Sequence, residues 1–263
     1  MHAQIQPIKT DLTDVAAVDS LVATRGDFDA CIYLAANGDP AASDAQPGFD
    51  LRANTVALVN LLERVHVGQF VFFSSGAVYD RISGPVDPVT PVCPRLPYAI
   101  SKLASEQYLH HFLHKGHIAG LVIARFFGAY GSYEPPRKIY NRLIRRFAFE
   151  RDPHFTVRGD GRNLIDAMHV DDAVRAIHLL LAARSGAVTL DLASHAPLTL
   201  SALVHQAARS FGLEADICFT GEVPEYNEFY STDTRMRDEY GFEPTIGVGD
   251  GLRRFAQTLR EAQ

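Results

Sequence analysis

The most informative segment for the fold class is Phe72-Phe73-Ser74-Ser75-Gly76-Ala77-Val78-Tyr79. The continuous apolar run over Gln69–Ser74 is typical of a strand that is buried on both faces of a parallel sheet. Ser75 therefore stands at the carboxyl end of a strand. Ligands of open α/β sheets bind in the crevice outside these strand ends, so Ser75 is a candidate site residue.

A second segment, Tyr98-Ala99-Ile100-Ser101-Lys102, carries a tyrosine and a lysine four residues apart. On a helix these two side chains lie one turn apart on the same face. An ammonium beside a phenol lowers the pKa of the phenol, and Tyr98 would then be a usable base near neutral pH. Ser75 could hydrogen-bond the same substrate oxygen. The three residues predict a proton-transfer site.

The flanking sequence alternates between strand and helix patterns. Strands are predicted over Gln4–Lys9, Ala30–Ala35 (buried), Gln69–Ser74 and Gly120–Arg125. Helices are predicted over Val15–Ala23, Phe49–His66, Tyr98–Lys115, Lys138–Phe149 and Ala173–Ala183. Gly84–Pro97 carries five prolines and is expected to be an ordered loop, and Thr156–Arg162 is expected to be a hairpin turn. The alternation predicts an α/β fold with a doubly wound parallel sheet.

Composition narrows the class of protein. The net charge of −6 and the pI of about 6.0 argue against binding to nucleic acid or to an anionic membrane. The 3 cysteines are odd in number and widely spaced, which favours reduced thiols and a cytoplasmic location. No metal site is expected, because Cys-x-x-Cys is absent and the 11 histidines lack a carboxylate cluster beside them. No apolar run has membrane-spanning length, and the N-terminus lacks the shape of a signal peptide.

The segments that contain Ser75, Tyr98 and Lys102 resemble those of the extended short-chain dehydrogenase/reductase superfamily, in its NAD-dependent epimerase/dehydratase branch. Further matches, in the family's order, are Asp11-Leu12-Thr13-Asp14, Tyr33-Leu34-Ala35-Ala36, Asn60-Leu61-Leu62-Glu63, Arg125–Gly131, His169-Val170-Asp171-Asp172 and Gly241-Phe242-Glu243-Pro244. The resemblance implies a Rossmann-like core over residues 1–130 that includes the catalytic helix. Residues 131–263 would form a mixed segment with a small C-terminal substrate lobe.

The resemblance also implies the site residues. The catalytic residues would be Ser75, Tyr98 and Lys102. The cofactor, NAD or NADP with NAD favoured, would contact Asp11, Leu12, Ala35, Ala36, Asn54, Tyr98, Lys102 and Phe126. The substrate, a small molecule and possibly a sugar nucleotide, would contact Ala77, Gly128, Arg158, Arg162 and His169. A homodimer that pairs through the Phe49–His66 and Tyr98–Lys115 helices is expected.

Several of these residues could have a structural role instead of a binding role. Asp11 could cap the Val15–Ala23 helix instead of meeting adenine. His169 could be structural, with Asp171-Asp172 capping the helix that follows. Arg158 or Arg162 could replace the family's arginine, because its Arg-Asp pair reads Ile165-Asp166 here.

The family's first strand, Gly-rich turn and helix are missing. Gly-x-x-Gly-x-x-Gly is absent, and the first glycine is Gly26. The missing turn is the main device that holds a dinucleotide pyrophosphate. The sheet is then expected to have an exposed apolar edge. A partner, a swapped segment or a rebuilt fold would cover it, or the sequence is a fragment of a longer active enzyme.

The reaction type is also constrained. In the family, sugar 4,6-dehydratases carry an acidic pair directly after the catalytic serine or threonine, and these positions are Gly76 and Ala77 here. The family's usual asparagine in the loop after Arg125 is Gly128. The leading hypothesis is an NAD(P)-dependent epimerase- or reductase-type oxidoreductase that acts on a hydroxyl or keto group. The alternative is a non-catalytic binding relative that lost its cofactor.

Overall fold

The computed structural model describes residues 5–182, 186–221 and 227–261. Their contacts group them into two compact units. The described residues 5–78, 93–124 and 186–189 form the first unit, and 79–92, 125–182, 190–221 and 227–261 form the second. The units alternate along the chain, whereas the sequence predicts one boundary near residue 130.

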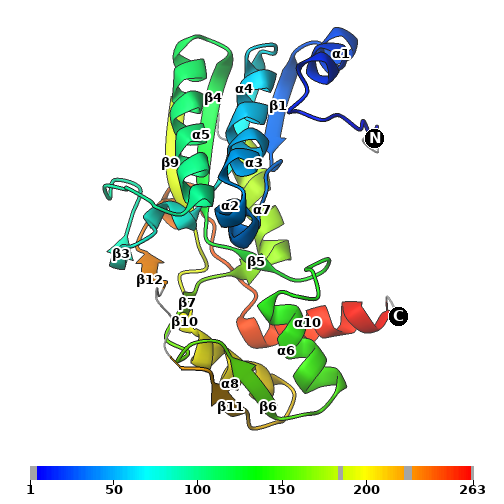
Figure 1. The fold of residues 1–263 in the computed structure, drawn as a ribbon, viewed down its shortest axis with the longest axis vertical. Helices are drawn as coiled ribbons and strands as arrows, with labels where there is room; N and C mark the ends of the chain where they lie inside the picture. The colour runs from blue at the N-terminus through cyan, green and yellow to red at the C-terminus, as the bar shows by residue number, and fades with distance from the viewer. Residues whose placement is uncertain (1–4, 183–185, 222–226, 262–263) are drawn as a thin grey trace. The chain divides into compact units, whose positions relative to one another are not determined.

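A four-stranded sheet has the strand order β1 (Phe28–Tyr33), β2 (Val67–Ser75), β4 (Ile118–Phe126) and β9 (Gly186–Leu192) (Figure 1). β1 and β2 are parallel, with Ala30 opposite Gln69 and Tyr33 opposite Phe72. β2 is buried along almost its whole length, as its apolar run predicts. The α/β class and the parallel sheet are confirmed.

Helices of the first unit cover this sheet. They are α1 (Val15–Arg25), α2 (Pro40–Ala45), α3 (Pro47–Leu51), the π-helical turn η1 (Arg52–Val56), α4 (Ala57–Leu62) and α5 (Pro97–His114). In Figure 1, α3, α4 and α5 lie along one face of the sheet. The core between them includes Leu58, Leu62, Phe70, Phe72, Leu109, Phe112 and Ile123. The expected helix over Phe49–His66 is thus present, but η1 interrupts its α-helical hydrogen bonding.

β1 lies at the edge of the four-stranded sheet. The strand predicted over Gln4–Lys9 is wrong for the described part: residues 5–10 form no strand, and Ile5 is 90% exposed. Gln4 lies outside the described residues. The burial predicted for Ala30–Ala35 is also wrong, because only Tyr33 of β1 is fully buried. Among the described residues β1 has a neighbouring strand on one side only, and Ile32 and Leu34 are 40% and 60% exposed, so in this part of the chain the sheet has the exposed apolar edge expected from the sequence.

The second unit contains short paired strands. They are β3 (Ser83–Val86) with β12 (Glu228–Ser231), β5 (Ala129–Tyr130) with β8 (Met168–His169), β6 (His154–Val157) with β11 (Asp216–Phe219), and β7 (Leu164–Ile165) with β10 (Leu198–Thr199). Its helices are α6 (Ile139–Ile144) with the π-helical turn η3 (Arg145–Phe149), α7 (Val170–Ala182), α8 (Leu200–Ser210), α9 (Arg235–Asp238) and α10 (Val248–Glu261). The core of this unit is built mainly by α6, α8 and α10.

Two predictions in this unit are corrected. Gly84–Pro97 is not all loop, because β3 pairs in parallel with β12 and accommodates Pro85 in a strand with one neighbour. The hairpin over Thr156–Arg162 does not form, because β6 pairs in parallel with β11, far away in the sequence. In both cases the partner strand is one that local sequence cannot reveal.

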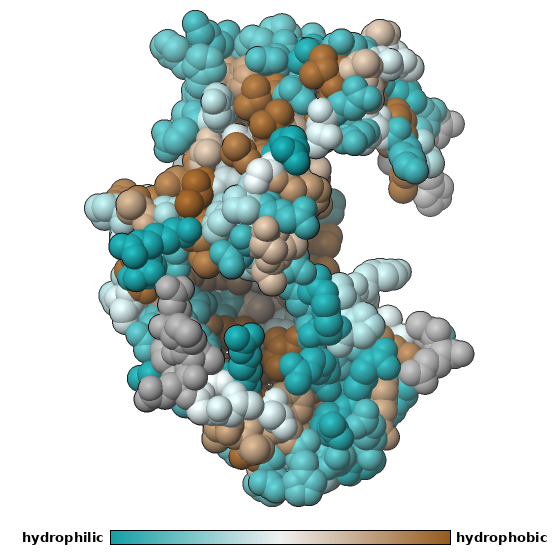
Figure 2. Space-filling model, viewed as in Figure 1, coloured by the Kyte–Doolittle hydropathy of each residue, from teal (hydrophilic) through white to brown (hydrophobic). Residues whose placement is uncertain are grey.

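Large apolar side chains reach the surface of the first unit (Figure 2). On α3, η1 and α5 these are Phe49, Leu51, Val56, Ile100 and Tyr108. No helix in the described part of the chain is long and apolar enough to cross a membrane.

Candidate active site

Ser75 is the last residue of β2, and a 3₁₀ turn, η2 (Gly76–Tyr79), follows it. Its Oγ accepts a hydrogen bond from the Ala77 backbone N–H at 3.1 Å. It is also hydrogen-bonded to the hydroxyl of Tyr98. Pro97 begins α5 after the extended Leu96, which suits proline because the first helical N–H needs no partner inside the helix. The strand end and the first turn of α5 thus bring Ser75 and Tyr98 together.

Lys102 lies one turn after Tyr98 and is only 4% exposed. Its ammonium donates to the backbone carbonyl oxygen of Phe73 at 2.7 Å. It lies 4.9 Å from the centroid of the Phe72 ring and 6.0 Å from that of the Tyr98 ring. The three predicted catalytic residues are therefore neighbours within the first unit.

Burial dominates the proton affinities of this site. It raises the pKa of Tyr98, the charge of Asp50 raises it further, and the hydrogen bond from Ser75 opposes the rise. Burial also lowers the pKa of Lys102 to about 8, against the opposing effect of Asp50 and Glu106. The lowered Tyr98 pKa expected from the sequence is thus wrong for this structure, because burial, together with the charge of Asp50, outweighs the hydrogen bond from Ser75.

Asn54 lies in the π-helical turn η1 and is 2% exposed. Its Oδ1 accepts from the Asn37 backbone N–H at 2.6 Å. Its Nδ2 donates to Asp50 Oδ1 and to Ser101 Oγ, each at 2.9 Å. π-helical turns are frequent at functional sites. Sequence reasoning missed Asp50, although its position four residues before Asn54 places both side chains on one helical face.

The other residues predicted to hold the cofactor lie in loops or, for Phe126, at the end of β4. Asp11 Oδ1 accepts from the backbone N–H and the hydroxyl of Thr13 at 2.9 and 2.7 Å. Asp14 is the residue that caps α1, so the capping role considered for Asp11 is wrong. The Leu12 carbonyl oxygen accepts from Asn60 Nδ2 at 3.0 Å. The remaining members are the exposed Ala35 and Ala36 and, in the second unit, the half-buried Phe126.

Ala77 is the one predicted substrate contact in the first unit. The other four belong to the second unit. Gly128 has φ of +142°, and its carbonyl oxygen accepts from the Met168 N–H at 3.1 Å. Arg158 and Arg162 are exposed, and Arg162 pairs with Asp160 at 2.7 Å.

His169 has the environment of a structural residue. It is 4% exposed, and its ring packs edge-to-face on Tyr130 with centroids 5.5 Å apart. Its Nδ1 accepts from the Asp171 N–H at 3.3 Å, and burial lowers its pKa. Asp172 does not precede the helix as a cap: it lies in the first turn of α7 and accepts from the Thr245 backbone N–H at 3.0 Å.

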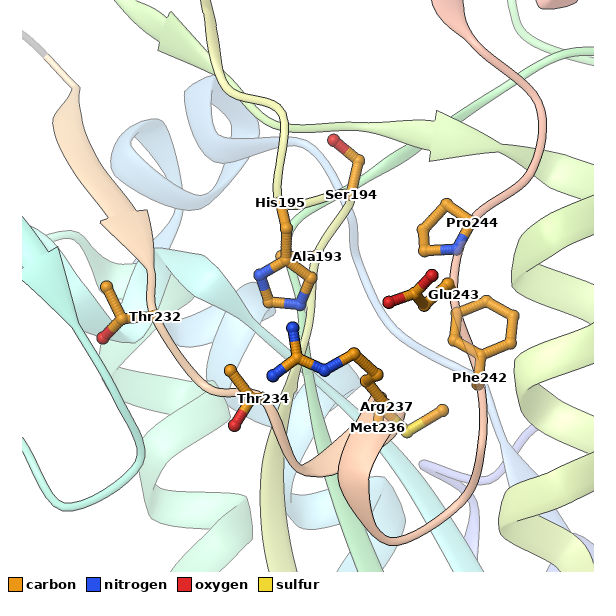
Figure 3. Close-up of a pocket in the computed structure, with 10 residues that line it drawn as sticks. All are labelled: Ala193, Ser194, His195, Thr232, Thr234, Met236, Arg237, Phe242, Glu243 and Pro244. Carbon is orange, nitrogen blue, oxygen red and sulfur yellow. The ribbon is translucent and has the colours of Figure 1, made fainter.

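A pocket of about 500 Å³ lies entirely within the second unit (Figure 3). It is lined by Ala193, Ser194, His195, Thr232, Thr234, Met236, Arg237, Phe242, Glu243 and Pro244. In Figure 3, the Arg237 guanidinium and the His195 ring point toward one another inside it. None of the residues predicted for the site lines this pocket. In the described ranges no cluster of three or more histidine, cysteine or acidic residues could hold a metal ion.

The parallel central sheet defines the class of this chain as an α/β protein, and comparison with known proteins identifies its family. The model of the NAD dependent epimerase/dehydratase family matches residues 1–190. A dTDP-glucose 4,6-dehydratase from Streptomyces niveus is 31% identical over 261 residues, which cover 97% of this chain and 76% of that protein. The chain belongs to the NAD-dependent epimerase/dehydratase family.

Solved structures share the fold. MoeE5 in complex with UDP-glucuronic acid and NAD is 27% identical, with a TM-score of 0.84 over 97% of this chain and 86% of MoeE5. RMD from Pseudomonas aeruginosa, complexed with NADPH, is 22% identical, with a TM-score of 0.87 over 98% of this chain and 89% of RMD. The expected Rossmann-like fold is confirmed.

Proposed function

We propose that this protein is an NAD(P)-dependent epimerase- or reductase-type enzyme that acts on a hydroxyl or keto group of a sugar nucleotide. The observation that carries the proposal is the Tyr98 hydroxyl, which is hydrogen-bonded to Ser75 at the end of β2. Lys102 lies one turn further along α5. The names of the S. niveus relative and of the MoeE5 complex support a sugar nucleotide as the substrate class.

Each residue has a distinct role in this proposal. Ser75 orients the reacting hydroxyl or carbonyl of the substrate, and Tyr98 gives or takes the proton at its phenolic oxygen. Because burial raises the pKa of Tyr98, the free protein holds this oxygen protonated near neutral pH, ready to donate to a carbonyl. The Lys102 ammonium stabilises the phenolate that donation leaves behind. The nicotinamide cofactor, when bound, supplies the hydride chemistry.

The residues of the candidate site fit the nicotinamide and ribose of the cofactor better than they fit its pyrophosphate. Asn54, Tyr98 and Lys102 gather polar groups at the carboxyl end of the sheet, where the ribose and nicotinamide would be held. The sequence has no Gly-rich turn for the pyrophosphate. Binding of NAD or NADP is therefore proposed mainly through its nicotinamide and the attached ribose, with Asp11, Leu12, Ala35 and Ala36 of the same unit as further contacts.

The turn after Ser75 supports epimerase or reductase chemistry over 4,6-dehydration. Gly76 and Ala77 carry no carboxylate, and the Ala77 N–H is used to hold Ser75 Oγ. A non-catalytic binding role is the second candidate. The sequence given contains no Gly-x-x-Gly-x-x-Gly motif, which is the observation that supports it.

The test is turnover of UDP-glucose, UDP-glucuronic acid and dTDP-glucose with NAD, followed by NMR of the sugar products. Tyr98→Phe should lower turnover by about 10²-fold or more without altering the circular dichroism spectrum, because only the proton-carrying oxygen is lost. Tyr108→Phe is the control, since Tyr108 is an exposed tyrosine of the same helix. Near-native turnover in Tyr98→Phe would contradict the assigned site. Absence of turnover with every sugar nucleotide would favour the binding role.

A further inference from the structure

Asp50 is a buried carboxylate to which the proposed chemistry assigns no role. It is 1% exposed, at the second-last position of α3. Its Oδ1 accepts from Ser43 Oγ at 2.6 Å, Asn54 Nδ2 at 2.9 Å and Asn37 Nδ2 at 3.2 Å. Its Oδ2 is buried and has no hydrogen-bond partner among the described residues. Three neutral donors thus fix one oxygen, and the other is left without a partner.

A buried carboxylate of this kind is costly unless a positive charge lies nearby. Hydrogen bonds connect Asp50 to the helix that carries Lys102: Asn54 Nδ2 donates both to Asp50 Oδ1 and to Ser101 Oγ, and Ser101 immediately precedes Lys102 on α5. The Lys102 ammonium is itself a buried cation that needs a countercharge. Lys102 is 4% exposed, and its ammonium donates to the Phe73 carbonyl oxygen and lies over the Phe72 ring. The charged groups that act on Lys102 are Asp50 and Glu106, and both favour its ammonium form. Asp50 also acts on Tyr98, where it disfavours the phenolate.

We propose that Asp50 is a positioning residue that supplies the countercharge for the buried Lys102 ammonium. The proposal rests on the function proposed for Tyr98 and Lys102. The Asp50 carboxylate is held in place by hydrogen bonds from Asn37, Ser43 and Asn54. Its electrostatic effect on Lys102 and Tyr98 is therefore present before the substrate binds. A negative charge favours the protonated form of both a nearby amine and a nearby phenol. Asp50 therefore favours the ammonium form of Lys102 and the neutral hydroxyl of Tyr98. In this state Tyr98 can donate a proton.

The Asp50→Asn variant removes the charge and keeps a carbonyl oxygen for the three donors. The direct readout is NMR titration of protein labelled with ¹³C in its lysine and tyrosine side chains. The chain has four lysines, so the Lys102 signal can be assigned by its loss in Lys102→Met, and the Tyr98 signal by its loss in Tyr98→Phe.

The expected pattern separates an electrostatic role from a structural one. In Asp50→Asn, the pKa values of both Lys102 and Tyr98 should fall, that of Lys102 by about 1 unit. In Glu106→Gln, the pKa of Lys102 alone should fall, because Glu106 acts on Lys102 and is not among the groups that shift Tyr98. Asp44→Asn, which alters an exposed carboxylate on α2, should change neither.

An unchanged Lys102 titration in Asp50→Asn overturns the proposal, and so does an equal shift in Asp44→Asn. A wild-type Lys102 that is already neutral at pH 7 overturns it without any variant. If Asp50→Asn does not fold, Asp50→Ser, which keeps a small oxygen acceptor, provides the same comparison. The titration needs no turnover. A lowered Lys102 pKa together with near-native activity of Tyr98→Phe would support the coupling and reject the catalytic assignment alone.

Discussion

The Ser74 hydroxyl donates to Glu106 Oε1 at 2.5 Å, and both side chains are buried. Ser74 immediately precedes Ser75 at the end of β2, and Glu106 follows Lys102 by one turn of α5. This bond links the strand that carries Ser75 directly to the helix that carries Tyr98 and Lys102. The hydrogen bond therefore helps to hold the end of β2 that carries Ser75 against the helix that carries Tyr98.

Ser75→Ala should lower turnover by less than Tyr98→Phe. The serine variant loses one hydrogen bond to the reacting oxygen, worth about 0.5–1.5 kcal/mol, or roughly tenfold in rate. The tyrosine variant loses the proton carrier itself. Steady-state rates of both variants on the same substrate check the order. A Ser75→Ala loss equal to or larger than that of Tyr98→Phe would contradict the roles assigned to these residues.

Free NAD should bind this chain weakly. Without a Gly-rich turn, several charge-assisted hydrogen bonds to the pyrophosphate are missing, each worth about 1.5–3 kcal/mol. The affinity for NAD should therefore be several orders of magnitude lower than that of a protein with a Gly-rich phosphate-binding turn. Isothermal titration calorimetry measures it directly. A low-micromolar dissociation constant would show that other residues hold the pyrophosphate.

The protein should form at least a dimer at micromolar concentration. Ile100 and Tyr108 on α5 are 47% and 46% exposed, and Phe49 on α3 is 46% exposed. Removing such apolar area from water stabilises association by about 25 cal/mol per Å² before other costs. Ile100→Glu with Tyr108→Glu should shift sedimentation toward monomer, and Val89→Glu, at an 86% exposed residue of the second unit, should not. A stable wild-type monomer would oppose this prediction.

Asp191 should make stability fall with rising pH. Its carboxylate accepts from the hydroxyls of Tyr79 and Ser231, yet burial raises its pKa from 3.8 to about 7. Between these two values the folded state binds one proton more than the unfolded state, so this group's stabilisation is complete below pH 3.8 and is lost by pH 7. The loss is on the order of 4 kcal/mol.

Urea unfolding at pH 4, 5.5 and 7 measures this effect. Asp191→Asn should remove the decline, because the amide does not titrate. Asp238→Asn is a control of opposite sign, since hydrogen bonds from Arg237 and Thr234 lower the pKa of this exposed carboxyl. If the free energy of unfolding still fell with rising pH in Asp191→Asn, another titrating group would be responsible.

Gly251→Ala should destabilise the second unit strongly. A Cβ at this position of α10 would lie 2.2 Å from the Tyr130 hydroxyl oxygen, in a core where Tyr130 stacks on Tyr140 at 4.1 Å. Overpacking of this kind typically costs about 1–3 kcal/mol. Gly247→Ala is the matched control, because its Cβ would meet nothing within 4 Å. Thermal unfolding of the two variants should separate them, and equal melting temperatures would contradict the packing.

The features that could be read from the amino-acid sequence are those that depend on local periodicity. The apolar run of β2, the helical spacing of Tyr98 and Lys102, and Pro97 at the start of α5 are all local patterns. They correctly predict a strand, a helix and the parallel sheet, because a strand or helix presents its residues at fixed intervals. Ser75 could be placed at a strand end for the same reason.

The neighbours of each group and the depth of its burial could be seen only in the folded chain. The exposure of β1 and the β6–β11 pairing depend on partner strands distant in the sequence. The proton affinity of Tyr98 depends on burial and on Asp50, neither of which the Tyr-x-x-x-Lys spacing reveals. Local spacing fixes where a side chain points, but electrostatic energy depends on the distance to every charge and on the exclusion of water, and folding sets both.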